Sequence, residues 1–165
     1  MSRGCQVGKS IKCRGCISFR NIPSGNIQIG NNVTFGKRVT LDVHPGGKLV
    51  IGNNVNFTQD IVISCATTVT IGSDVIVAEH VSIRDADHGT NIGQAIACQP
   101  LVSLPVVIED DVWIAAGVRV LKGALVKKGS ILASNTVYLG SVSGIECGIY
   151  GGVPARLIGK REFGI

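Results

Sequence analysis

Apolar residues recur at every sixth position through the second half of the chain. The series that starts at residue 108 is Ile108, Ile114, Val120, Val126, Leu132 and Tyr138. Three residues after each of the first five members stands a residue that tolerates a positive φ, as a tight corner requires: Asp111, Gly117, Gly123, Gly129 and Asn135. The next position is small or β-branched, at Val112, Val118, Ala124, Ser130 and Thr136. Each hexad therefore predicts one short strand followed by a turn.

The same pattern runs through the N-terminal half as triplets of hexads separated by short slippages. The triplets are Val7, Cys13 and Phe19; Ile29, Phe35 and Leu41; Ile51, Phe57 and Ile63; and Ile71, Val77 and Ile83. Three hexads make a prism with three flat faces and three corners, so each triplet predicts one coil of a parallel β-solenoid. Six coils at a strand spacing of about 4.8 Å predict a rod about 29 Å long.

The composition agrees with a solenoid. Of the 165 residues 22 are Gly, and aromatic residues make up only 4%. Aliphatic side chains of medium size fit a narrow bore filled by stacked neighbours, and glycines serve the corners. We therefore expect an all-β protein with a single domain spanning residues 1–165.

Charge and cysteine usage exclude several classes of protein. The net charge of +5 is spread in short clusters, which does not indicate a nucleic-acid stripe but suits a ligand that carries phosphates. The N-terminus lacks the apolar core of a signal peptide and no window is long enough to span a bilayer, so we expect a cytoplasmic protein without membrane insertion. The six cysteines are scattered and should be reduced thiols, because the C-x-x-C at residues 13–16 has no second pair.

The repeat resembles that of the hexapeptide-repeat acyltransferases. Residues 108–117, IEDDVWIAAG, are similar to the segment IGDNVWIGAG of the sugar O-acetyltransferase branch, which includes maltose and galactoside acetyltransferases. Residues 149–158, IYGGVPARLI, resemble its closing segment AGVPAKVI. The resemblance implies a left-handed parallel β-helix of about six triangular coils with a short C-terminal cap. It also implies an acetyl-CoA-dependent O-acetyltransferase that acts on a sugar or a surface-polysaccharide precursor and requires no metal.

One long excursion, at about residues 84–107, interrupts the coils. Such a break in a rigid scaffold is where function usually lies. His88 stands near its start, and in the family a histidine at this point acts as general base. An imidazole that titrates near neutrality can remove the proton of a sugar hydroxyl as its oxygen attacks a thioester. We predict direct transfer without a covalent enzyme intermediate.

The other polar residues near the excursion are candidates for binding the acceptor. Either Asp85 or Asp87 could orient the His88 ring or bind acceptor hydroxyls, and the sequence leaves this choice open. His44 follows the third strand of an earlier coil and could border the same site. His80 falls at a corner position, where a histidine in a turn is expected.

The donor site should follow the coils formed by residues 108–138. Small residues at stacked corners would let coenzyme A approach the backbone, either as a site or as ordinary lattice packing. By correspondence with the family, the residues expected to bind the donor are Trp113, Ala115, Ala116, Ala133, Ser134, Arg156 and Lys160, with Arg161 as a further phosphate ligand. Leu139-Gly140 stands where many members have Thr-Lys, so some contacts to the coenzyme must differ.

Several alternatives stay open. The family commonly forms homotrimers whose sites lie between subunits, so a homotrimer is expected here. The acceptor could instead be an amino sugar on a nucleotide carrier or a xenobiotic. A γ-type carbonic anhydrase would need its three histidines to meet, but His44 and His80 follow strands of different faces. A non-catalytic scaffold would have no reason for the His88 excursion.

Overall fold

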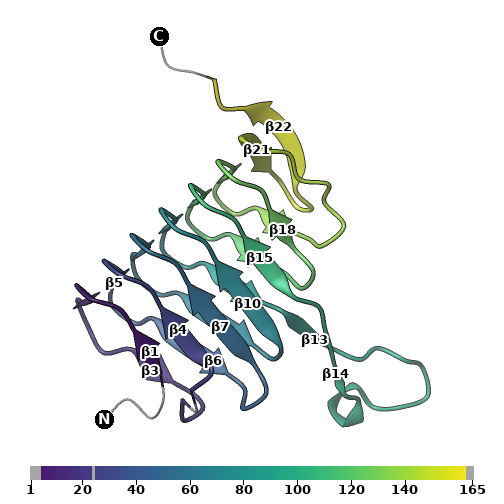
Figure 1. Ribbon diagram of the computed structural model, residues 1–165. Coiled ribbons are helices and arrows are strands. Elements are labelled where there is room, and N and C mark those ends of the chain that lie inside the picture. Colours follow the sequence, from purple (N-terminus) through teal and green to yellow (C-terminus); the bar gives the residue numbers. More distant parts are fainter. Residues whose placement is uncertain (1–4, 24, 163–165) are drawn as a thin grey trace.

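The chain folds as a parallel β-solenoid with three sheets and no α-helix among the described residues. A computed structural model describes residues 5–23 and 25–162. Figure 1 shows the coils stacked along one axis, with the N-terminal coil at one end and the C-terminal strands at the other. The all-β solenoid predicted from the hexads is confirmed. The expectation about a signal peptide rests partly on residues 1–4, which lie outside the described residues.

The three sheets are named A, B and C in the order in which the chain visits them. Sheet A contains β1 (Gln6–Val7), β4 (Ile27–Ile29), β7 (Lys48–Ile51), β10 (Thr68–Ile71), β15 (Val106–Ile108) and β18 (Leu125–Val126). Sheet B contains β2 (Lys12–Cys13), β5 (Thr34–Phe35), β8 (Asn56–Phe57), β11 (Ile76–Val77), β16 (Trp113–Ile114), β19 (Ile131–Leu132), β21 (Gly148–Gly151) and β22 (Arg156–Lys160). Sheet C contains β3 (Ser18–Phe19), β6 (Thr40–Val43), β9 (Val62–Cys65), β12 (Ser82–Arg84), β17 (Arg119–Val120) and β20 (Val137–Tyr138). We call the three edges of the prism the AB, BC and CA corners.

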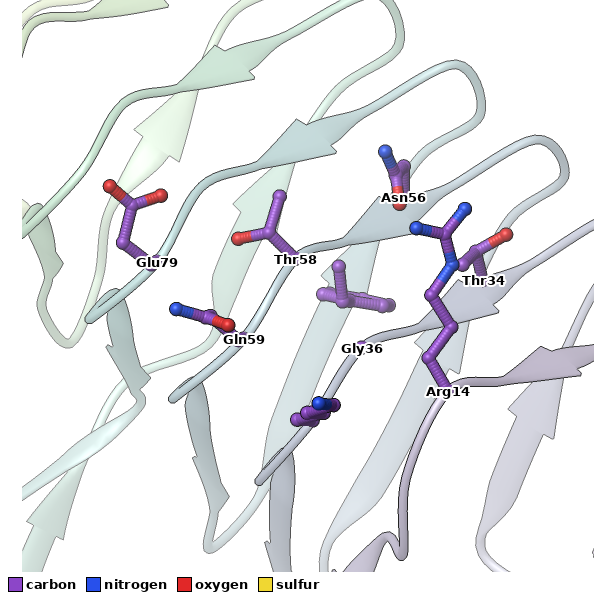
Figure 2. A pocket seen from close by; sticks show the side chains of 9 residues that line it. Arg14, Thr34, Gly36, Asn56, Thr58, Gln59 and Glu79 are labelled. Atoms are coloured by element: carbon purple, nitrogen blue, oxygen red, sulfur yellow. The ribbon is translucent and has the colours of Figure 1, made fainter.

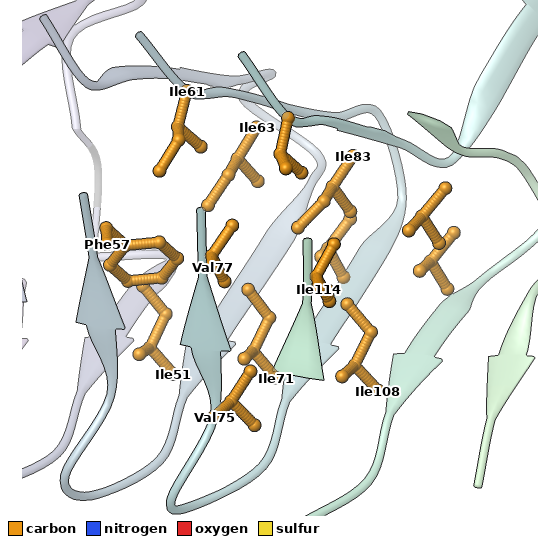
Figure 3. Packing of buried hydrophobic residues seen from close by; sticks show 14 of the residues in the cluster. Ile51, Phe57, Ile61, Ile63, Ile71, Val75, Val77, Ile83, Ile108 and Ile114 are labelled. Carbon is orange, nitrogen blue, oxygen red and sulfur yellow. The ribbon is translucent and has the colours of Figure 1, made fainter. Parts of the chain in front are cut away.

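The strand pairings place the predicted apolar positions in register. In sheet A, Ile29 pairs with Ile51, Ile51 with Ile71, and Ile71 with Ile108. Sheets B and C stack their own series in the same way, for example Val77 with Ile114. Figure 3 shows these side chains filling the bore from all three sheets. Each inward side chain packs on its counterpart one coil away, which is why aliphatic residues of similar size recur.

The corners carry the backbone conformations that the spacing predicts. All five predicted corner residues of the C-terminal coils have positive φ, between 56° and 74°, and so does His80, at 60°. At the AB corner, side chains also satisfy backbone donors of the coil below: the Asn31 Oδ1 accepts from the Lys9 N–H at 2.8 Å, and the Asn53 Oδ1 accepts from the Asn31 N–H at 2.8 Å. The polar corner residues therefore join successive coils in addition to forming turns.

The first coil differs from the others because none of the described residues forms a coil beneath it. The inward positions of coils two to six are buried or nearly so, whereas Val7 is 51% exposed and Phe19 and Cys13 are also exposed. The hexad pattern is the same in this coil. Burial depends on having a neighbour on both sides.

The solenoid also continues further than predicted. Sheet B has a seventh parallel strand, β21, whose Tyr150 pairs with Leu132 and is buried. The Tyr150 ring meets the Tyr138 ring edge-on, with centroids 5.2 Å apart. The strand β22 then runs antiparallel to β21 and forms the C-terminal cap. About seven turns are therefore present instead of about six.

The excursion is an ordered hairpin rather than an open loop. β13 (Ala86–His88) pairs antiparallel with β14 (Leu101–Ser103), and a 3-10 turn, Ile96–Cys98, lies between them. We call residues 86–103 the arm; Figure 1 shows it projecting sideways from the coils at the CA corner. No helix in the described ranges is long and apolar enough to cross a membrane. All six cysteines are unpaired.

Candidate functional site

A hollow of about 230 Å³ lies at the CA corner, where the arm leaves the solenoid. His44, Ser64, Arg84, Asp87 and His88 supply its polar lining, and Ala66, Ala86 and Leu101 complete it. The structure thus brings together three residues that the sequence proposed for one site, His44, Asp87 and His88. Two further lining residues, Ser64 and Arg84, were not predicted.

His88 is held at the end of β13 by the pairing of the arm. Its Cα is opposite that of Leu101 in the hairpin. The following Gly89 donates its N–H to the Pro100 carbonyl at 3.0 Å, and a Cβ at position 89 would lie 2.9 Å from the Gln99 Oε1. The arm therefore closes tightly behind His88, whose exposed ring lines the hollow.

A buried glutamine organises the inside of the arm. The Gln99 side chain is nearly inaccessible; its Oε1 accepts from the Asn91 N–H at 2.8 Å, and its Nε2 donates to the carbonyls of Asn91 and Gln94 at 3.0 and 2.9 Å. Because both the oxygen and the nitrogen of this buried side-chain amide are hydrogen-bonded to the backbone, Gln99 holds the loop in one conformation although the loop has no apolar core. Nothing in the sequence pattern indicates this role of Gln99.

His44 enters the hollow from a tight turn one coil below Ser64. The Gly47 N–H donates to the His44 carbonyl at 2.8 Å, and the Asn26 side-chain amide donates to the carbonyls of His44 and Gly47 at 2.9 and 2.8 Å. These bonds hold the His44 backbone, while its half-buried ring remains at the wall of the hollow. His44 therefore lies at the same hollow as His88, and its role in binding the acceptor stays a prediction.

Asp85 lies outside the hollow. Its carboxylate is buried and accepts from the backbone N–H groups of Ala66, Thr67 and Thr68 at 2.7 to 2.8 Å, and from the Thr67 hydroxyl at 3.0 Å. One of these bonds ends on Oδ1 and three end on Oδ2, so the carboxylate caps the turn at residues 66–68. Between the two aspartates that the sequence could not separate, only Asp87 faces the hollow.

Asp87 is tied to the solenoid by an ion pair. Its Oδ2 lies 3.2 Å from the Lys122 Nζ, at the turn that precedes β18. Asp87 lies at the base of the arm and Lys122 on the coil above, so this ion pair connects the two. The Leu104 N–H donates to the Asp85 carbonyl at 2.9 Å and joins the two ends of the arm, and the Leu104 carbonyl accepts from the Gly123 N–H of the coil above at 3.1 Å.

The small residues predicted for the donor form a column at the BC corner. The Ala115 N–H donates to the Leu132 carbonyl and the Ala133 N–H to the Tyr150 carbonyl, at 2.9 and 2.8 Å, so the two alanines lie one above the other. Ala116 and Ser134 follow them in register. Trp113 stands beside this column on the outer face of sheet B and is 48% exposed.

The outer face of sheet B changes character along the rod. Its outward positions are Lys12, Thr34 and Asn56 in the first three coils, and Ile76, Trp113 and Ile131 in the next three. The column of small residues at the BC corner therefore lies next to the coils whose sheet B positions are apolar on the outside. The repeat alone gives no such distinction, because all these positions are outward.

The predicted phosphate ligands are separated by the length of β22. Arg156 pairs with Gly151 at the end of β22 near the BC corner, and lines a hollow of about 240 Å³ with Ser141, Tyr150 and Leu157. Lys160 pairs with Gly148 at the other end, near the AB corner. Arg161 is there as well, with its Nη1 2.7 Å from the Asp111 Oδ2. Only Arg156 lies on the side of the small-residue column.

The two halves of the predicted site occupy different edges of the prism. His44 and His88 are at the CA corner, between sheets C and A, whereas the small-residue column is at the BC corner. His80 is also at the BC corner, so the three histidines do not meet within one chain. No group of three His, Cys, Asp or Glu side chains that could hold a metal ion occurs in the described part of the chain.

A second groove, of about 320 Å³, continues the BC corner toward the N-terminus. Figure 2 shows the Arg14 side chain extending alongside Thr34, with Thr58 and Glu79 further along the groove. A Cβ on Gly36 would overlap the Thr58 carbonyl oxygen, so only glycine lets the coils approach here. Sequence reasoning missed this groove because its residues come from four separate coils.

Cys65 lies directly behind the hollow, at the end of β9 and next to Ser64. Burial, together with the nearby Asp85 charge, raises the pKa of its thiol to about 11. The Sγ is 3.3 Å from the Lys48 carbonyl. The thiol is thus held protonated near neutral pH and is buried.

No protein-family model matches the chain, but curated proteins do. It is 33% identical over 144 residues to the putative lipopolysaccharide biosynthesis O-acetyl transferase WbbJ of Escherichia coli. This match covers 82% of this chain and 72% of that protein. It is 31% identical over 137 residues to a probable acetyltransferase of Mycobacterium tuberculosis, again over 82% of this chain. That match covers 45% of the mycobacterial protein, so the chain spans less than half of that relative.

Solved structures share the fold at lower identity. A structure of AntD, an N-acyltransferase from Bacillus cereus in complex with dTDP and coenzyme A, superposes with a TM-score of 0.77 at 18% identity and covers 95% of this chain and 84% of that one. A hexapeptide-repeat-containing acetyltransferase from Vibrio cholerae, complexed with acetyl coenzyme A, gives a TM-score of 0.62 at 22% identity, over 94% of this chain and 72% of that one.

Proposed function

This chain belongs to the hexapeptide-repeat acetyltransferases, and from that premise we propose that it moves the acetyl group of acetyl-CoA to a hydroxyl of a sugar or a surface-polysaccharide precursor. The observation that carries the proposal is the CA-corner hollow, in which an exposed histidine stands at the base of an ordered arm. The relative named as an O-acetyl transferase of lipopolysaccharide biosynthesis supports the choice of a hydroxyl on a glycan.

His88 acts as the general base in this proposal. A ring nitrogen of His88 accepts the proton of the acceptor hydroxyl while the hydroxyl oxygen forms a bond to the thioester carbonyl carbon. The tetrahedral intermediate then expels coenzyme A as a thiolate, and the His88 proton is returned to that sulfur or to water. His44 shares the hollow and is suited to hydrogen bonding with the acceptor or with the developing oxyanion.

The donor is proposed to lie along the BC corner. The pantetheine arm fits a surface where the small-residue column meets the apolar outer face around Trp113. Arg156 is the basic residue on that side and would bind a phosphate of the coenzyme. Lys160 and Arg161 are at the far end of β22, so we leave them out of the donor site.

The separation of donor and base favours a homotrimer with sites between subunits. The BC corner of one rod must face the CA corner of another for acetyl-CoA to reach His88. The arm also exposes apolar side chains that its own solenoid leaves uncovered, at Ile92, Ile96, Leu101 and Val102. Exposed apolar groups of this density on a projecting hairpin suit contact with a second copy.

A second candidate is N-acetylation of an amino sugar carried on a nucleotide. AntD is an N-acyltransferase crystallised with dTDP and coenzyme A, and its fold covers 95% of this chain. The same base serves both reactions, since an amine must also lose a proton during attack. The two candidates differ only in the acceptor, so a panel containing sugars and amino sugars separates them.

The proposal is tested by thiol release from acetyl-CoA across such a panel. We expect His88→Ala to lower kcat/KM by about 10²- to 10⁴-fold, the usual contribution of a general base. The matched control is Asp74→Asn at the AB corner, where no residue of the proposed site lies, because asparagine accepts the positive φ there and can still accept from the Asn54 amide. Full turnover by the His88→Ala protein on a verified acceptor would show that the base is another group.

A further inference from the structure

Arg84 brings a positive charge to the hollow and forms no ion pair among the described residues. It is the last residue of β12 and faces outward from sheet C beside Ser64 of β9, with which it is paired in register. Adjacent parallel strands lie about 4.8 Å apart, so the two side chains emerge as neighbours. Both line the hollow with His44 and His88.

The Arg84 guanidinium is oriented by a serine of its own strand. Its Nε and Nη2 both donate to the Ser82 Oγ, at 3.2 and 3.0 Å. Ser82 is nearly buried, so this contact fixes one edge of the guanidinium on the sheet. The Nη1 hydrogens and the second Nη2 hydrogen remain available, in the planar arrangement that matches two oxygens of a carboxylate or phosphate.

The acidic groups around Arg84 are already paired with other partners. Asp87 is in contact with Lys122, and the Asp85 carboxylate is buried and accepts four hydrogen bonds from the turn at residues 66–68. Asp42, two strands away in the same outward row, lies 3.5 Å from the Arg20 Nη1 and accepts from the Asn21 side chain. Within residues 5–23 and 25–162, Arg84 has no ion pair.

We propose that Arg84, with the Ser64 hydroxyl, binds an anionic group of the acceptor and so selects acidic sugars over neutral ones. The group is a carboxylate or a phosphate a few ångströms from the hydroxyl that reacts. This inference rests on the proposed acetyl transfer at His88, because it assigns the acceptor of that same hollow. It makes Arg84 a residue of specificity, and His88 remains the base.

The test measures binding and turnover separately. Binding of methyl glucuronide, glucose 1-phosphate and methyl glucoside is followed by calorimetry at millimolar concentrations, without acetyl-CoA. The first two ligands distinguish a carboxylate from a phosphate, and the third is the neutral reference. Thiol release from acetyl-CoA is then measured with the same three sugars.

We expect wild-type protein to bind one acidic sugar at least about ten-fold more tightly than the neutral one. Arg84→Gln should weaken binding of that acidic sugar by about 10- to 100-fold, the range for losing a hydrogen-bonded charge, and leave the neutral sugar unchanged. Arg84→Lys should recover part of the loss, because it keeps the charge without the fork. The control Lys9→Gln removes one positive charge at the AB corner and should alter neither Kd.

Other outcomes overturn the proposal. It is wrong if the wild-type protein binds no acidic sugar better than the neutral one, or if Arg84→Gln weakens all three equally. Failure of the proposed function has a different signature, in which His88→Ala keeps full turnover, or no sugar is acetylated, while Arg84→Gln still abolishes selective binding. Unchanged thermal unfolding of Arg84→Gln shows that the comparison concerns folded protein.

Discussion

Replacement of Asp85 by asparagine tests whether this carboxylate holds the fold or serves the chemistry. An asparagine can keep its carbonyl oxygen toward Thr67 and Thr68, but its NH₂ then faces the Ala66 N–H, which the Asp85 Oδ1 now accepts at 2.7 Å. One buried donor left without an acceptor costs about 1–3 kcal/mol. The three remaining bonds become neutral and lose about 1 kcal/mol each, partly offset because no charge is buried.

The expected net loss is about 3 kcal/mol in the free energy of unfolding. For a chain of 165 residues this corresponds to a Tm lower by about 6–12 °C. Asp87→Asn is the matched control, since it makes the same chemical change two residues away. That residue is about half exposed and paired only with Lys122, so its loss should cost about 0–1 kcal/mol.

Thermal unfolding is measured at equal protomer concentration, because self-association raises the apparent Tm. Urea titration of the same three proteins gives the free energies independently of heating. Equal Tm values for Asp85→Asn and wild type would refute the view that Asp85 caps the turn at residues 66–68. A large loss of kcat without a change in stability would instead return Asp85 to the catalytic site.

Four further outcomes follow from burial and contact. Gly36→Ala should lower stability by about 2 kcal/mol or more, because its Cβ overlaps the Thr58 carbonyl oxygen, and urea unfolding measures the change. At pH 8 a disulfide reagent should modify the exposed Cys98 and spare the buried Cys65, as mass spectrometry of the native protein can show. Since the pKa of the Cys65 thiol is raised to about 11, the unfolded thiol ionises first and stability should fall as the pH rises from about 8.5 toward 11. Ile92→Ser should weaken self-association in sedimentation experiments and leave the far-ultraviolet spectrum unchanged, because that side chain is fully exposed in the single chain.

The hexads predicted the fold closely because the information is local and repeated. Ile71 and Ile108 are 37 residues apart and still pair, since the arm is inserted between coils without changing the register. The positive φ at Asp111 and His80 was likewise readable from residue type and position. The seventh row at Tyr150 was missed because the apolar series breaks after Tyr138, where position 144 is Gly, and resumes only at Tyr150.

The candidate site was only partly readable. His88 could be proposed from the break in the repeat, and His44 from its place after a third strand. Asp85 and Asp87 could not be distinguished, because the chain leaves the solenoid at this point and the alternation of a regular strand no longer applies. Arg84 was overlooked since an outward charged residue on a strand is ordinary until its neighbours are known.

By itself the sequence determined the period, the corners, the inward residues and the place of the arm, since each depends on contacts between a residue and its equivalent one coil away. Only the tertiary structure decided which polar residues meet. The edge of the prism that a residue occupies depends on how many residues separate successive hexad triplets. These lengths place His44 and His88 at the same edge and the small-residue column at another. Whether a charged side chain is available to a ligand also depends on its partners in the fold. The Asp85 carboxylate is buried against a turn, whereas Arg84 lines the hollow without an ion pair.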